Sequence, residues 1–357
     1  MTITEWGLRA MLWWQSRSGP ITKFLDRKDY RRPSFPERAG NVRVAAVQMR
    51  MELVEGPEEW AERLYRQLLP AVENGAQMVL FPESTGTPLL GLFPDLRRLI
   101  EELGDVEAVL EEIGGGRLEV ADLLHFMGPA TGRIYEAVFS RLARGFHLHL
   151  GAGTAYLPGP GGRVYSVFTL FGPDGRILAR QRKIHPLPWE RSWGVSGGAD
   201  LTVQPTALGR LGLAVFPDER DFEVFRMLRL QGAEIVLLPS ADFERAGDYA
   251  DLSGLWARTQ ESQVYAVRSA MVGSLLGRRF SGRSAILAPR ALSPSGDGLL
   301  AEAGTTDREE VIWADLDLER LADFRREHPL RWNLGLYRRY LPEVYREEAE
   351  RAREETP

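Results

Sequence analysis

Apolar and polar positions follow strand and helix periods in turn along most of the chain. The segment VRVAAVQM at 42–49 is β-branched and predicts a strand. Apolar residues at helical spacing, such as Trp60 and Leu68, follow it, and the apolar run AQMVLFPE at 76–83 predicts the next strand. The pattern therefore predicts a β-α-β unit at the start of a folded domain.

The alternation continues towards the C-terminus. Residues 134–145 predict a helix, and Pro173-Asp174-Gly175 is a strong signal for a reversal between two strands. Alternating helices with buried, β-rich runs predict an α/β layered fold with helices outside the sheets. The remaining elements are expected as strands at 146–156, two strands within 164–185, a strand at 208–216, a helix at 223–233, a strand at 234–241, a helix at 256–265, and strands at 266–272, 284–288 and 309–318.

Three parts are expected along the chain. Residues 1–41 form an N-terminal extension that ends in a charged, Pro-containing linker or surface-hugging segment. Residues 42–325 form the folded domain, and residues 326–357 form an Arg- and Glu-rich C-terminal arm. Within the domain, the Leu-rich stretch 86–128 contains three consecutive glycines and predicts an inserted lid or cover.

Composition limits the classes of function. The 357-residue chain has a formal charge of -5 at pH 7 and no basic stripe suited to phosphates, so we expect no nucleic-acid partner. No apolar stretch reaches the roughly 20 residues of a membrane span. The N-terminus has no small-residue cleavage site of the kind that ends a secretion signal, so a cytoplasmic location is the default expectation.

The chain contains no cysteine, which excludes disulfides and every reaction that needs a thiolate. Polar residues of interest stand at predicted strand ends: Glu83 in LFPEST, Lys183 in RQRKIHP, and the turn VFPDERDFE at 215–223. Lys183 is one of three lysines among 45 basic residues. An ammonium group can release its proton in a suitable pocket, whereas a guanidinium group stays charged.

These segments resemble the nitrilase, or carbon-nitrogen hydrolase, superfamily over about residues 42–325. FPE at 81–83 is similar to the segment that carries the family's general-base glutamate, and PDGRILARQRKIHP to the segment that carries its lysine. Glu190 stands close to the position of a second glutamate in many members. Residues 211–241 are similar to the nucleophile segment except at its centre. ARTQES, GRSAILAP and VIWADLDL resemble the segments that follow.

The resemblance implies a four-layer α-β-β-α sandwich and catalysis by a cysteine thiolate, a glutamate that moves its proton, and a lysine that stabilises the developing oxyanion. Phe216 stands at the position of the cysteine. The next residue in the family donates a backbone N–H to the oxyanion, and here it is Pro217, which has none. We expect the Phe216 ring to fill the space that substrate would otherwise use.

Three functions are consistent with these residues. The first is a family member that lost its nucleophile and now binds or regulates; its ligand would be a small molecule such as an amide or carboxylate. The second is an amidase-like enzyme in which Glu83 activates water, Lys183 polarises the carbonyl and Glu190 orients the substrate. The third is a partner subunit of an active homologue. The resemblance further implies a homodimer or higher homo-oligomer, and ligand specificity set by the lid at 88–128.

Other polar and aromatic residues have structural interpretations. Asp218 and Arg220 match positions that fix the turn in the family. His147 and His149 share a strand face but have no third ligand at a helpful spacing, so no metal or other cofactor is expected. The tryptophan-rich N-terminal segment is open to binding at a membrane interface, but it lacks dense Lys and Arg, which favours packing against its own domain or a second subunit.

Overall fold

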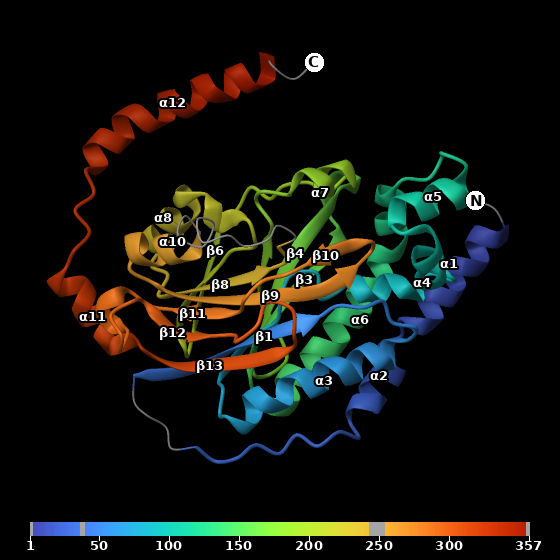
Figure 1. The fold of residues 1–357 in the computed structure, drawn as a ribbon, viewed down its shortest axis with the longest axis horizontal. Helices are drawn as coiled ribbons and strands as arrows, with labels where there is room; N and C mark the ends of the chain where they lie inside the picture. The colour runs from blue at the N-terminus through green and yellow to red at the C-terminus, as the bar shows by residue number, and fades with distance from the viewer. Residues whose placement is uncertain (1–2, 36–39, 243–253, 355–357) are drawn as a thin grey trace. The chain divides into compact units, whose positions relative to one another are not determined.

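The computed structural model describes residues 3–35, 40–242 and 254–354 (Figure 1). Its backbone divides into two compact units, Met1–Leu321 and Ala322–Pro357. The first unit holds the sheet and the candidate site. The second, taken by itself, contains the end of α11 (Leu318–Glu327) and the long helix α12 (Leu334–Glu354), which carries many Arg and Glu residues as the sequence predicts.

One continuous ladder of strands runs in the order β5-β4-β3-β2-β1-β9-β8-β7-β6. In its first half, β1, β2 and β3 are parallel, whereas β4, β5 and β13 pair antiparallel with their neighbours. A strand reversal lies between β4 and β5, as Pro173-Asp174-Gly175 predicts. The strands are β1 (Asn41–Arg50), β2 (Met78–Leu80), β3 (His149–Pro158), β4 (Val164–Phe171), β5 (Ile177–Arg182) and β13 (Glu310–Asp317).

In the second half of the ladder, β7, β8 and β9 are parallel and the flanking strands are antiparallel. The two halves join where Met49 and Arg50 of β1 pair with Met271 and Val272 of β9. The second-half strands are β6 (Thr202–Thr206), β7 (Gly209–Leu213), β8 (Ile235–Ser240), β9 (Tyr265–Leu275), β10 (Arg278–Phe280), β11 (Ala285–Leu287) and β12 (Leu299–Glu302).

Helices cover the outer face of each half of the ladder. α3 (Pro57–Glu73) and α6 (Val120–Phe146) contact β1 and β3, and α8 (Phe222–Leu230) and α10 (Leu255–Ser262) contact β7 and β9. α3 shows why such helices form: Pro57 opens it, and one face buries apolar residues such as Trp60 and Leu68. Each half of the ladder has its own apolar core beneath its helices, which confirms the predicted α-β-β-α sandwich.

In the described part of the chain, each of the remaining helical elements has 13 residues or fewer. The set is α1 (Ile3–Gln15), α2 (Ser18–Leu25), η1 (Thr87–Leu92), α4 (Leu96–Leu103), α5 (Val106–Gly114), η2 (Pro160–Gly162), α7 (Pro188–Ser192), η3 (Asp218–Arg220) and η4 (Arg290–Leu292).

The helix predicted at 134–145 begins earlier, at Val120, and takes in the end of the predicted lid. Its residue Pro129 lies inside the helix, where proline costs roughly 3 kcal/mol. Packing offsets this cost, because α6 lies against β3 and α2 along its length. Residues 120–128 therefore belong to α6, and the rest of the stretch predicted as a lid contains η1, α4 and α5.

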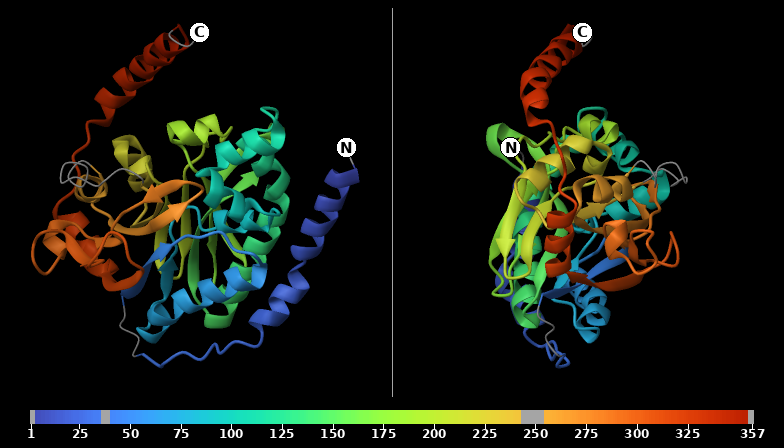
Figure 2. Two further views of the ribbon diagram at one scale, coloured as in Figure 1. Left: turned by 45° about the vertical axis from the view of Figure 1, so that its right-hand side comes forward. Right: turned by 90° about the vertical axis from the view of Figure 1, so that its left-hand side faces the viewer.

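The N-terminal residues contain two helices, α1 and α2, that lie beside α6 in both Figure 1 and the left view of Figure 2. Beyond them, the guanidinium of Arg32 donates hydrogen bonds to the carbonyls of Ala76 and Phe146, so this part of the predicted tail lies on the domain surface. Residues 36–39 of the tail are outside the described residues. No helix in the described ranges combines the length and apolarity needed to cross a membrane.

Candidate functional site

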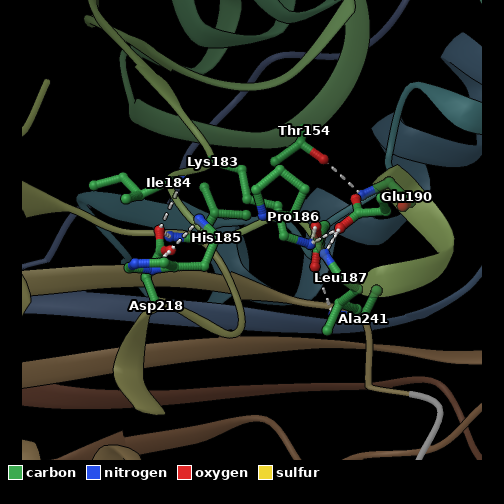
Figure 3. A network of polar contacts seen from close by, with 12 residues as sticks. Thr154, Lys183, Ile184, His185, Pro186, Leu187, Glu190, Asp218 and Ala241 are labelled. Atoms are coloured by element: carbon green, nitrogen blue, oxygen red, sulfur yellow. Dashed lines mark hydrogen bonds and ion pairs between the residues drawn. The ribbon is translucent and has the colours of Figure 1, made fainter. Parts of the chain in front are cut away.

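Lys183 lies at the centre of a buried ion cluster (Figure 3). Its Nζ is 2.8 Å from Oε1 of Glu83 and 2.5 Å from Oε2 of Glu190. Glu83 follows β2, whereas Lys183 follows β5 and Glu190 lies on α7, the next element along the chain, so two distant parts of the chain supply the three groups. Lys183 and Glu190 are completely buried and Glu83 is 2% exposed. The three charged residues singled out in the sequence are thus brought into direct contact.

Glu190 has further hydrogen bonds that fix its position. Its Oε2 accepts from the backbone N–H of Leu187 at 2.8 Å, as expected for a carboxylate in the first turn of a helix that begins at Pro188. Its Oε1 accepts from the hydroxyl of Tyr156 on β3 at 3.1 Å. Glu190 is therefore held by the helix end, a buried tyrosine and Lys183 together.

Glu83 and Phe216 are both attached to the end of β8. The second carboxylate oxygen of Glu83 accepts from the backbone N–H of Ala241 at 3.1 Å. The backbone N–H of Phe216 donates to the carbonyl of Pro239, two residues earlier, also at 3.1 Å. The Phe216 ring is buried, and the guanidinium of Arg220 lies 5.0 Å from its centre. The Phe216 turn and the ion cluster therefore share one strand end.

Asp218 ties the same turn to the Lys183 segment. Its buried carboxylate accepts from the backbone N–H of Val215 at 3.1 Å and from that of His185 at 3.0 Å (Figure 3). His185 is two residues after Lys183. Asp218 thus has the structural role expected from the sequence, and it holds residues 215–218 next to the ion cluster.

The charges of the cluster do not balance, because one ammonium faces two carboxylates. Burial raises the pKa of Glu83 to about 8; the attraction of Lys183 opposes this and the charge of Glu190 adds to it. Burial alone would lower the pKa of Lys183, but Glu83 and Glu190 outweigh burial and raise it. Near pH 7 the arrangement therefore favours a charged Lys183 beside a Glu83 that keeps its proton.

The carbon-nitrogen hydrolase family model matches residues 43–326, most of the chain and all of this site. The chain belongs to the carbon-nitrogen hydrolase family. Its relatives include a protein called probable hydrolase YhcX of Bacillus subtilis, which is 25% identical over 316 residues. That match covers 85% of this chain and 54% of the relative, so the chain spans about half the length of YhcX.

Other relatives of this family member carry the names of amidases. Omega-amidase NIT2 of Xenopus tropicalis is 26% identical over 301 residues, with 81% of this chain and 93% of the relative covered. Deaminated glutathione amidase of Synechocystis is 25% identical over 258 residues, with 66% and 92% covered.

Solved structures show the same fold. One is a mutant amidase from Nesterenkonia sp. AN1 with the acetamide moiety of fluoroacetamide covalently added at its active-site cysteine; it has a TM-score of 0.61 and 22% identity and covers 86% of this chain and 100% of its own. Another is the NitFhit protein of C. elegans, with a TM-score of 0.64, 22% identity, and 84% and 67% covered.

Three polar residues near the site in this family member were not singled out in the sequence: Tyr156, Thr154 and Glu219. Tyr156 and Thr154 share one side of β3, and Thr154 accepts from the backbone N–H of Ser84 beside Glu83. Two polar residues at alternate positions near the end of an apolar strand were a usable signal. Glu219 is 4% exposed, burial raises its pKa to about 7, and its Oε2 has no hydrogen-bond partner. Nothing in the sequence distinguished it from a surface residue.

His147 and His149, the two histidines considered as metal ligands, lie where α6 ends and β3 begins. Both line a surface cavity of about 990 Å³ with Arg32 and Arg43. Over residues 3–35, 40–242 and 254–354, no cluster of three or more His, Asp or Glu side chains could hold a metal ion.

The raised carboxyl pKa values predict how stability changes with pH. Between about pH 4.5 and pH 8, folded Glu83 keeps a proton that the unfolded chain releases, so the free energy of unfolding should fall as pH rises and level off above pH 8. One such group gives a slope of at most about 1.4 kcal/mol per pH unit. Glu83→Gln should flatten this slope, whereas the exposed control Glu112→Gln should not. Urea unfolding at a series of pH values measures it, and a wild-type stability that rises from pH 5 to pH 8 would contradict the assignment.

Proposed function

We propose that this family member binds a small carbonyl compound at Glu83, Lys183 and Glu190 and does not hydrolyse it through a thiol. The observation that carries the proposal is the Phe216-Pro217 pair in a turn that is hydrogen-bonded to the strand end holding Glu83. The chain has no cysteine that could act from elsewhere. A buried phenyl ring at the nucleophile position offers packing and no bond-forming atom.

Pro217 supports the same proposal independently. A prolyl nitrogen has no hydrogen, so it cannot stabilise an oxyanion that develops on the neighbouring carbonyl. Loss of one such donor costs roughly 3 to 4 kcal/mol of barrier in enzymes where it has been removed. The covalent route thus lacks both its nucleophile and one of its electrostatic supports.

The remaining groups suit recognition of a carbonyl or carboxylate oxygen. Lys183 can donate to such an oxygen, and a Glu83 that keeps its proton is itself a donor. The relatives named as amidases suggest a small amide, or the carboxylate derived from it, as the ligand class. Ordered donors in a dry site are well suited to binding such a group tightly.

A thiol-free hydrolase is the competing function, and one observation favours it. The pKa of Glu83, about 8, lies close to physiological pH, as is typical of groups that transfer protons in catalysis. In this alternative, Glu83 would take a proton from water while Lys183 polarised the amide carbonyl.

Ammonia release from a panel of small amides separates the two functions. We expect wild-type protein and Glu83→Gln to give the same rate as buffer alone, with Glu112→Gln as the matched surface control. Turnover by wild type that is lost in both Glu83→Gln and Lys183→Ala would refute the non-hydrolytic proposal and establish the competing one.

A further inference from the structure

Three segments far apart in the chain meet at the carboxylate of Glu107, on α5. Its Oε1 accepts from the indole N–H of Trp193 at 2.8 Å and from Nη2 of Arg278 at 2.8 Å. Trp193 follows α7, and Arg278 begins β10. One carboxylate oxygen therefore joins the predicted lid to α7 and to the β9–β10 hairpin.

The aromatic residues of α7 strengthen this junction. The guanidinium of Arg278 lies 5.0 Å from the ring centre of Trp189 and 5.5 Å from that of Trp193. The two indoles contact each other edge to face, with ring centres 4.6 Å apart. A guanidinium over two aromatic faces is attracted by both rings. Arg278 is thus held by a carboxylate and two indoles.

The turn of the β9–β10 hairpin fits closely against the lid. Leu276 and Gly277 both have positive φ values, 52° and 82°, as in a two-residue turn between antiparallel strands. A Cβ added to Gly277 would lie 2.4 Å from the Cβ of Asp105. Asp105 in turn caps α5 by accepting from the backbone N–H of Ala108. The hairpin turn therefore touches the start of the helix that carries Glu107.

The same junction leads directly to the ion cluster. The ring of Trp193 contacts that of Tyr156, with centres 6.4 Å apart, and Tyr156 donates to Glu190. Glu190 itself lies on the short helix α7, between Trp189 of the same helix and Trp193, which follows the helix. Any movement that frees α7 would therefore also move a carboxylate that binds Lys183.

We propose that Glu107, Trp193 and Arg278 form a latch that holds the lid and α7 closed over the buried ion cluster, and that a ligand reaches the cluster when this latch opens. The part of the proposal that concerns a ligand rests on the proposed function. The three latch residues are positioning residues, because they act on the site through α7 and Tyr156.

Opening the latch should cost less free energy than opening the buried ion cluster. Glu107 Oε2 and Arg278 Nε are buried but have no hydrogen-bond partner, so closure leaves two polar atoms unsatisfied. The Arg278 and Glu107 side chains are 31% and 41% exposed, so water and salt can compete for their ion pair. By contrast, Lys183 and its two carboxylates have almost no exposed surface.

Hydrogen exchange measured by mass spectrometry on the full chain tests the latch without any ligand. We expect Arg278→Ala to speed exchange of the amides at 106–114 and 189–193 by at least about tenfold. Arg279→Ala, on the exposed side of the same strand, should leave exchange unchanged. Glu107→Ala should act like Arg278→Ala, and the double variant should exchange at least as fast as either one, because each single variant leaves one contact with Trp193 in place. Unchanged exchange in both single variants would overturn the latch.

Access to the site is measured separately, by the rate at which fluoroacetamide labels a cysteine introduced as Phe216→Cys. Labelling should be at least about tenfold faster with Arg278→Ala than with Arg279→Ala if the latch controls entry. Equal labelling rates would overturn control of entry by the latch. Faster exchange with no labelling in any Phe216→Cys background would instead refute the placement of Phe216 in the site, and with it the proposed function.

Discussion

Lys183→Met is expected to lower the free energy of unfolding by about 3–5 kcal/mol near pH 8, because it leaves the buried carboxylate of Glu190 without a counter-ion while Glu83 keeps its proton. Glu83 and Glu190 both contact Lys183 Nζ, and neither has appreciable exposed surface. The loss should be smaller at pH 5, where protonation of a carboxylate relieves the imbalance. Urea unfolding at the two pH values measures both the size of the loss and its pH dependence.

Two variants control for this effect. Adding Glu83→Gln and Glu190→Gln to Lys183→Met should recover much of the lost stability, because no buried charge then remains in the cluster. The exposed lysine Lys23 gives the matched control, since Lys23→Met removes the same charge from the surface. A loss below about 1 kcal/mol for Lys183→Met, the range typical of surface ion pairs, would show that the cluster is not buried as described.

The sequence allowed Glu83 and Lys183 to be singled out for a physical reason. Both stand just beyond predicted strands, and strand ends of an α/β sheet are where polar side chains converge. Glu190 was suggested by the family resemblance, and its place in the first turn of α7 explains how it reaches Lys183.

Contacts between distant segments could not be predicted in the same way. Glu107 and Arg278 are 171 residues apart, and each looks like an ordinary surface charge in its local sequence. The start of α6 was misplaced because Gly128-Pro129 is a local signal against helix, whereas tertiary packing decides the outcome. Tyr156 needed the register of β3 against its neighbours before its hydroxyl could be placed on Glu190.

Phe216→Cys with Pro217→Tyr is expected to give a site that a thiol reagent modifies. The first change supplies the sulfur, and the second restores a backbone N–H beside it. Fluoroacetamide suits the test, since its acetamide moiety adds covalently to the active-site cysteine of a mutant of the Nesterenkonia amidase. The thiolate sulfur would bond to its methylene carbon and fluoride would leave.

Phe225→Cys is the matched control, because Phe225 is a phenylalanine of α8 that is buried completely in the apolar core of the second half of the ladder. Glu83→Gln added to the reactive variant tests whether the labelled thiol depends on the cluster. Its labelling should slow above pH 8, where Glu83 is ionised and can accept the thiol proton.

The central claim is that Phe216 occupies the place of the nucleophile beside Glu83 and Lys183. Intact-mass spectrometry of the folded Phe216→Cys/Pro217→Tyr variant after exposure to fluoroacetamide tests it most directly. The account predicts one added acetamide group per chain in this variant and none in Phe225→Cys under the same conditions. A folded Phe216→Cys/Pro217→Tyr variant that stays unlabelled, or labelling as fast in Phe225→Cys, would contradict it.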